Sequence, residues 1–197
     1  MGKISSLEWN RQLFHIFFGI GIVFLLLYDF IDKNIILMFV VIGFILSNLS
    51  KKIRIPIIYN LLIKFERKEE LKRFPGKGVI FYLIGIYISL LIFSKDIAMA
   101  SIMVLALGDS ISHLFGLHYG KIKHPLSKTK FLEGTFAGFI FGFIGAFVFL
   151  PFREAFFASL AAMVFEAIEI KIGTEQVDDN LTVPFIAGAA VWIVRLL

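Results

Sequence analysis

The sequence predicts an all-α membrane protein with about seven transmembrane helices, a cytoplasmic N-terminus and one cytoplasmic amphipathic helix. Of its 197 residues, 58% are hydrophobic and only 18% are charged, whereas soluble domains are about one quarter charged. Apolar runs recur along the whole chain, and Lys and Arg gather in alternate loops. These observations exclude an ordinary cytosolic enzyme, a disordered protein and a nucleic-acid-binding module, so no nucleic-acid partner is expected. Because the chain has no Cys, thiolate ligands and disulfides are also excluded.

Short polar segments separate the apolar runs. Several runs are shorter than the roughly 20 residues that a perpendicular helix needs to cross a bilayer, so we expect their polar flanks to join the helices. The fourth run in particular should continue through Gly108 and Asp109 towards His118. The seven runs cover residues 14–28, 35–49, 79–93, 97–107, 135–150, 155–168 and 181–197.

The distribution of positive charge predicts the orientation. If the N-terminus lies inside, 16 of the 20 Lys and Arg residues fall in inner segments and four in outer segments. Positive residues concentrate on the cytoplasmic side of membrane proteins. We therefore expect a single membrane domain, residues 1–197, with its N-terminus inside and its C-terminus outside.

The inner segment 50–77 predicts an amphipathic helix on the membrane surface. Pro56 suits a first helical turn, and Leu61, Leu62 and Phe65 follow at helical spacing among many Lys and Arg residues. Such a helix would lie on anionic head groups. The alternative is a solvated basic loop.

The inner segment 108–135 carries the residue types that a polyphosphate needs. Lysines, hydroxyls and glycines precede a helix start, where the dipole favours anions, and Asp109 lies at membrane depth, where a carboxylate needs a cation or a cavity. The segment lacks the Walker sequence, and the alternative is a charged loop that only fixes topology. We predict a phosphate-binding site here, with candidate residues Asp109, Lys121, Lys128, Thr129, Glu133 and Gly134.

A second acidic group occupies residues 169–184 and the turn before them. Glu166 and Glu169 share one helical face, and Asp178, Asp179 and Asn180 precede the last apolar run. Helix capping explains one such acid, but not the whole group. Hard oxygen ligands suit magnesium, so Asp109, Glu166, Asp178 and Asp179 are the candidate metal ligands.

A third group lies at the first apolar run. Glu8, Arg11 and His15 share one helical face, and His15 points into the membrane, where a polar side chain is expensive. Arg11 and Glu8 have the alternative of an ordinary interfacial pair. Lys77, in a glycine-flanked turn, either binds phosphate or anchors a helix end.

The order of these motifs resembles the CTP-dependent lipid-alcohol kinases, the family of dolichol kinase, phytol kinase and the yeast-type diacylglycerol kinase. The motifs span nearly the whole chain: ExxRQxxHxxxG from Glu8, PGKG from Pro75, GD at 108–109 with GxxxGK ending at Lys121, KTKFLEGT from Lys128, and DDNLTVP from Asp178. The segment from GD to EGT is also similar to CDP-diacylglycerol synthases. This chain lacks their longer serine-rich signature and has the N-terminal RQxxH element, which favours the kinases.

The resemblance implies CTP as donor, Mg²⁺ as cofactor and a lipid alcohol as acceptor. It places Lys128, Thr129, Glu133 and Gly134 in a CTP-binding loop, and matches Asp109 and Asp178 to Asn180 with the family's acidic motifs. We assign Lys121 to phosphate binding, and Arg11, His15 and Lys77 to the site by inference, with His15 or a carboxylate taking the hydroxyl proton.

Several alternatives remain open on the sequence. They are a cytidylyltransferase that acts on a lipid phosphate, a diacylglycerol-type kinase, a transporter and a purely structural membrane protein. A polyprenol or dolichol is the expected acceptor, and the expected location is a prokaryotic plasma membrane with the active site facing the cytoplasm. The oligomeric state is not predicted.

Overall fold

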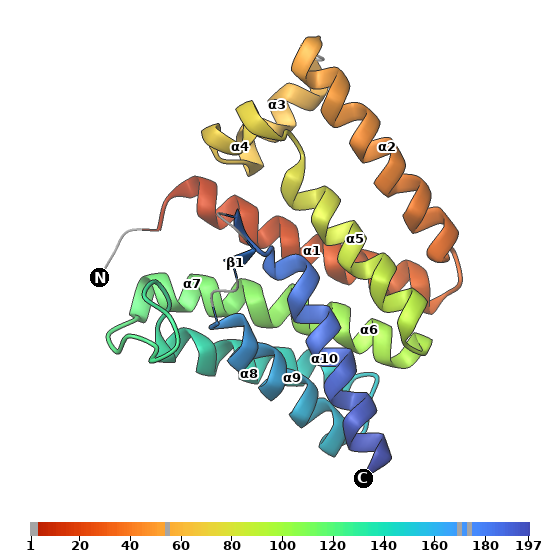
Figure 1. Ribbon diagram of the computed structural model, residues 1–197, viewed down its shortest axis with the longest axis vertical. Helices are drawn as coiled ribbons and strands as arrows, with labels where there is room; N and C mark the ends of the chain where they lie inside the picture. Colours follow the sequence, from red (N-terminus) through yellow and green to blue (C-terminus); the bar gives the residue numbers. More distant parts are fainter. Residues whose placement is uncertain (1–3, 54–55, 169–170, 173–174) are drawn as a thin grey trace.

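The computed structural model describes residues 4–53, 56–168, 171–172 and 175–197, and its framework is helical (Figure 1). The apolar runs coincide with long helices, as expected. Among the described residues, two short antiparallel strands lie in the acidic loop, and an isolated β-bridge joins Lys123 and Phe131. The elements are α1 (Ser6–Leu27), α2 (Lys33–Lys52), α3 (Pro56–Phe65), α4 (Lys68–Arg73), α5 (Lys77–Ile92), α6 (Lys95–Met103), η1 (Val104–Asp109), α7 (Ser110–Tyr119), α8 (Leu132–Phe147), α9 (Phe152–Glu166), β1 (Lys171–Ile172), β2 (Glu175–Gln176) and α10 (Asp179–Leu196).

Four of the described helical segments are long and apolar enough to cross a membrane: Ser6–Leu27, Lys33–Lys51, Lys95–Tyr119 and Asp179–Leu196. The helices Lys77–Ile92 and Leu132–Phe147 are apolar but shorter. The chain is therefore an integral membrane protein by its apolar helices. Seven crossings and the inside position of the N-terminus stay predictions.

Capping residues set where several helices begin. The Ser5 hydroxyl accepts a hydrogen bond from the Glu8 amide at 3.2 Å and starts α1. The Asp32 carboxylate accepts from the Asn34 and Ile35 amides at 3.0 and 2.9 Å and starts α2. These bonds satisfy amides that the first turn leaves without partners.

A continuous rod of α6, η1 and α7 runs through the centre of the bundle, and 72% of its apolar window is buried. The expected extension of the fourth run past Asp109 is confirmed, since the helix ends at Tyr119. Its middle turn, η1, is π-helical, a wider winding that often occurs at functional sites. Asp109 is the last residue of this turn.

Small residues let α8 approach the rod closely. A Cβ at Gly138 would lie 2.7 Å from the Gly108 carbonyl oxygen and 2.7 Å from the Ser112 Cβ. A Cβ at Gly134 would lie 2.5 Å from the Ser112 carbonyl oxygen. The glycines of α8 thus form a packing seam that fixes the rod, and with it Asp109.

The segment 50–77 forms two helices where one was expected. A helix begins at Pro56 as predicted, but it ends at Phe65, and the short α4 follows from Lys68. The break falls at Glu66, whose carboxylate turns back to accept a hydrogen bond from the Gly76 amide at 2.9 Å. Gly76 has a φ of +81°, which glycine adopts without strain, and it leads the chain into α5. Contact of these helices with a membrane surface stays a prediction.

Candidate functional site

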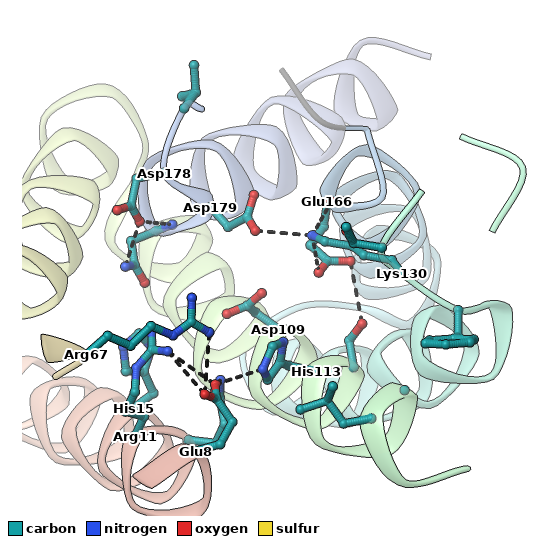
Figure 2. Close-up of a pocket in the computed structure, with 18 of the residues that line it drawn as sticks. Glu8, Arg11, His15, Arg67, Asp109, His113, Lys130, Glu166, Asp178 and Asp179 are labelled. Atoms are coloured by element: carbon teal, nitrogen blue, oxygen red, sulfur yellow. Dashed lines mark hydrogen bonds and ion pairs between the residues drawn. The ribbon is translucent and has the colours of Figure 1, made fainter. Parts of the chain in front are cut away.

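A polar cavity of about 490 Å³ opens where α1, α7, α9 and α10 converge. Its walls come from segments that are far apart in sequence: the first turns of α1, the end of η1, the loop before α8, the end of α9 and the start of α10. Figure 2 shows charged side chains from all of these segments pointing toward one another around Asp109. The cavity thus gathers residues from each of the polar groups found in the sequence.

One wall of the cavity is acidic. Asp109, Glu166 and Asp179 each offer a carboxylate oxygen within 4.8 Å of the other two. Glu166 is buried, with 3% of its surface exposed, and Ser112 contacts its Oε2 at 3.5 Å. We call these three carboxylates the acidic trio. Three converging oxygen ligands are the donor set that a hard divalent cation prefers.

Lys130 supplies a positive charge to the acidic trio. Its ammonium donates to Glu166 Oε1 at 2.5 Å and to Asp179 Oδ2 at 3.1 Å. Burial alone would lower the pKa of Lys130, but the Glu166 and Asp179 carboxylates outweigh it and raise the pKa above its usual range. Lys130 is therefore held as an ammonium ion among these acids.

The opposite wall is built around Glu8, which is 8% exposed. Its carboxylate pairs with Arg11 at 3.2 Å and with Arg67 at 3.4 Å, and it contacts His113 Nε2 at 2.7 Å. Figure 2 shows these side chains converging on Glu8 from three directions. We call Glu8, Arg11, Arg67 and His113 the α1 cluster. It carries more positive than negative charge at the cavity surface.

Lys77 and Asp178 form a third part of the rim. Asp178 caps α10, accepting from the Asn180 amide at 3.1 Å and from its Nδ2 at 2.8 Å. Its other oxygen lies 3.7 Å from Lys77 Nζ. Burial raises the pKa of Asp178, and the bonds from Asn180 and the charge of Lys77 oppose that rise. Asp178 therefore has a capping role, and the acidic trio is completed by Asp179.

His15 lies deep in the wall, between this cavity and a second, apolar pocket. Its ring meets Tyr82 edge-on, with centroids 4.9 Å apart. Its Nδ1 is buried and has no hydrogen-bond partner among the described residues. A buried imidazole nitrogen of this kind is either left unsatisfied at a cost or reserved for a ligand.

The cavity brings together most of the residues expected from the sequence: Arg11, His15, Lys77, Asp109, Thr129, Glu166, Asp178, Asp179 and Asn180. Other expected residues lie away from its lining. Lys121 and Lys128 are exposed, and Glu133 accepts from the Lys121 and Ile122 amides at 3.1 Å, which shapes the loop. Gly134 is packed against α7. Roles for these four in nucleotide binding stay predictions. Glu169 lies outside the described residues.

Four titratable residues of the cavity lining are not among those that the sequence predicted. Lys130 is one of four loop lysines, and nothing in their spacing separates it from Lys128. Glu8 belongs to the ExxRQxxHxxxG motif, but the sequence alone is equally consistent with an ordinary interfacial pair between Glu8 and Arg11. His113 follows Asp109 by four residues, a spacing that places both on one helical face. Arg67 carried no local signal, because its partner Glu8 is 59 positions away.

Comparison with known proteins places the chain in a family. It is 36% identical to an uncharacterized protein of Methanocaldococcus jannaschii over 92% of this chain and 91% of that one. It is 27% identical to CTP-dependent diacylglycerol kinase 1 of Schizosaccharomyces pombe, over 70% of this chain and 68% of that one. It is also 27% identical to phytol kinase 1 of Arabidopsis thaliana, over 68% of this chain and 49% of that one. The chain belongs to the CTP-dependent lipid kinase family.

The relatives differ in how much of them the chain spans. It covers nearly all of the archaeal protein but only about half the length of the phytol kinase. No family model matches the chain. No solved structure matches it either.

Proposed function

We propose that this protein transfers the γ-phosphate of CTP to the hydroxyl of a membrane lipid alcohol in the polar cavity. The proposal rests on one observation: the acidic trio and the α1 cluster line the same cavity, and an apolar pocket lies next to it. Phosphoryl transfer requires mainly positioning and charge neutralisation. The relatives, a CTP-dependent diacylglycerol kinase and a phytol kinase, support CTP as the donor and a lipid alcohol as the acceptor class.

The acidic trio fits a divalent cation, with Mg²⁺ as our proposal. Its three oxygens converge, they are hard ligands, and no thiol competes for the site. Asp109, Glu166 and Asp179 would hold the ion. When bound, the cation would neutralise charge on the phosphate oxygens. Lys130 now bonds to two of the trio, so its ammonium and the cation would share or exchange these ligands.

The positive side chains of the other wall would hold the triphosphate. Arg11 and Arg67 project into the cavity while their partner Glu8 fixes their positions. Lys77 begins α5, where the helix dipole adds to its charge, and Asp178 orients it. Guanidinium groups can bind phosphate oxygens through two donors at once.

We assign His15 as the group that accepts the proton of the acceptor hydroxyl. Its Nδ1 is unpartnered among the described residues, and the ring borders both the polar cavity and the apolar pocket. The hydroxyl oxygen forms a bond to the γ-phosphorus, and the bond from that phosphorus to the bridging oxygen breaks. CDP leaves, and the hydroxyl proton goes to His15.

The finer parts of the proposal concern the acceptor and the location. We propose a polyprenol or dolichol as the first acceptor to test, with diacylglycerol as the alternative. The cavity is formed by Glu8, Arg67 and Lys130, which come from segments that the charge distribution assigns to the cytoplasmic side. We therefore propose a site facing the cytoplasm of a prokaryotic plasma membrane.

The test uses purified protein in detergent with Mg²⁺, a panel of lipid alcohols and lipid phosphates, and CTP labelled at the α- or the γ-phosphate. We expect γ-label in the lipid and release of CDP. Label from the α-position, with release of pyrophosphate, would identify a cytidylyltransferase instead. Absence of both labels from every lipid would refute both activities for the tested classes.

A further inference from the structure

We infer that the apolar pocket between α1, α2 and α3 holds the hydrocarbon chain of the lipid alcohol beside its hydroxyl, and that this pocket selects a neutral alcohol over an anionic lipid phosphate. The inference rests on the proposed function and extends it to the acceptor. The pocket has a volume of about 270 Å³. It therefore holds the part of a long chain that lies nearest to the hydroxyl.

Its position connects it to the polar cavity. Arg11 and His15 line both spaces, so α1 forms a shared wall. The remaining walls are the C-terminal half of α2, the inner face of α3 and the start of α5. In Figure 1, α2 lies at the edge of the molecule with α3 and α4 beside its C-terminal end. A lipid in this pocket would place its hydroxyl at His15.

The lining suits an amphiphile. Phe14, Leu46, Leu61, Leu62 and Phe65 make most of the surface apolar. Two buried polar atoms interrupt it: Ser47 Oγ and Glu66 Oε1 have no hydrogen-bond partner among the described residues. These side chains are 4% and 6% exposed. Unsatisfied polar atoms in an apolar pocket are costly, which indicates that the pocket receives a ligand with polar groups of its own.

The charges of the pocket favour a neutral head group. Of the charged residues that line it, Glu66 and Glu70 are acidic and Arg11 is basic. Burial raises the pKa of Glu66, while the Gly76 amide bonded to its other oxygen opposes that rise. A lipid phosphate would bring its negative charge next to these acids, whereas an alcohol would not. This distinction separates the substrate of a kinase from that of a cytidylyltransferase.

The first experiment locates the lipid without requiring turnover. A long-chain alcohol with a diazirine near its hydroxyl is photolysed with the purified protein, and the labelled residues are identified by mass spectrometry. We expect labels on Leu46, Leu61 and Leu62. An excess of polyprenol or diacylglycerol should prevent this labelling, whereas an excess of phosphatidic acid should not. Comparing the two neutral competitors identifies the better acceptor chain. Labels confined to other helices, or equal competition by phosphatidic acid, would overturn the inference.

The second experiment fills the pocket. Ser47→Phe places a ring inside it, and Ile45→Phe, on the exposed side of the same helix at 53% exposure, is the matched control. We expect Ser47→Phe to raise the KM for the lipid alcohol about tenfold or more and to leave the KM for CTP unchanged. In the control variant, both KM values should stay unchanged. CTP binding by Ser47→Phe serves as the test of folding. An unchanged lipid KM in a variant that binds CTP would overturn the inference.

The outcomes separate this inference from the proposed function. Photolabelling in the pocket without transfer from CTP would refute the kinase proposal and leave the lipid site standing. Transfer of phosphate from CTP together with an unaltered KM for the lipid alcohol in Ser47→Phe would refute the lipid site and leave the kinase proposal standing.

Discussion

The two walls of the cavity differ in the sign of their excess charge. In the acidic trio, three carboxylates face one ammonium, that of Lys130. In the α1 cluster, one carboxylate, that of Glu8, is surrounded by two guanidinium groups and an imidazole. The first wall has negative charge in excess and needs a cation, whereas the second has positive charge in excess and attracts phosphate. The proposed reaction needs both, on either side of one substrate.

The walls also differ in how they are held. Asp109 belongs to the buried rod and is fixed by helix packing through the glycines of α8. Arg67 comes from a polar segment, has 54% of its side chain exposed and depends on its pairing with Glu8. Substitutions on the first wall should therefore alter chemistry, and substitutions on the second should alter affinity.

The largest expected effect comes from the acidic trio. Asp109→Asn keeps the shape of the side chain and removes its charge, so we expect phosphoryl transfer to fall roughly 10³-fold, the scale seen when a preorganised electrostatic contact is lost. The measurement is the rate of γ-label transfer from CTP. Asp29→Asn, which removes an exposed partner of Lys95 on a different part of the protein, is the control. Near-normal transfer by Asp109→Asn would remove Asp109 from the proposed metal site.

The next effect concerns the α1 cluster. Arg67→Gln removes one of the two guanidinium groups, and we expect the KM for CTP to rise about 10- to 100-fold with a smaller change in kcat. Arg153→Gln, at an exposed position on α9, is the control. If kcat falls while the KM for CTP is unchanged, Arg67 acts in the chemical step. The assignment of CTP binding to the α1 cluster and of catalysis to the acidic trio would then be wrong.

A third prediction concerns competition at the acidic trio. Lys130→Met removes the ammonium that bonds to Glu166 and Asp179, so we expect Mn²⁺, used as a probe for Mg²⁺, to bind about tenfold more tightly without nucleotide. Electron paramagnetic resonance titration measures the free ion, and chelation should reverse the binding. Lys33→Met, at the exposed start of α2, is the control. Weaker binding by Lys130→Met would show that Lys130 supports the metal site.

The smallest effect tests the packing that holds Asp109. Gly138→Ala adds a methyl group 2.7 Å from Gly108 and Ser112, and we expect a loss of about 1 kcal/mol in unfolding free energy through overpacking. Gly21→Ala is matched to it, because a Cβ there meets nothing within 4 Å, and alanine should be neutral or stabilising in a helix. Thermal unfolding in detergent compares the two. Equal melting temperatures would show that α8 and the rod adjust without cost.

The helical membrane framework is predictable from the sequence, because apolar runs and capping residues act locally. The sequence located Asp109 on a continuous helix and Pro56 at a helix start, and its motifs identified the family. It also predicted that the polar inner segments carry the site, since a buried charge in a membrane protein requires a partner or a cavity.

Which of those polar residues lie together depends on how the helices pack. Lys130 rather than Lys121 or Lys128 reaches the acids, because only the path of the loop before α8 determines which lysine points inward. Asp179 rather than Asp178 completes the trio, because Asp178 caps α10 and turns toward Lys77. Arg67 joins Glu8 across 59 positions, and the apolar pocket arises where three helices converge. Such contacts between distant segments depend on helix packing, which no local pattern encodes.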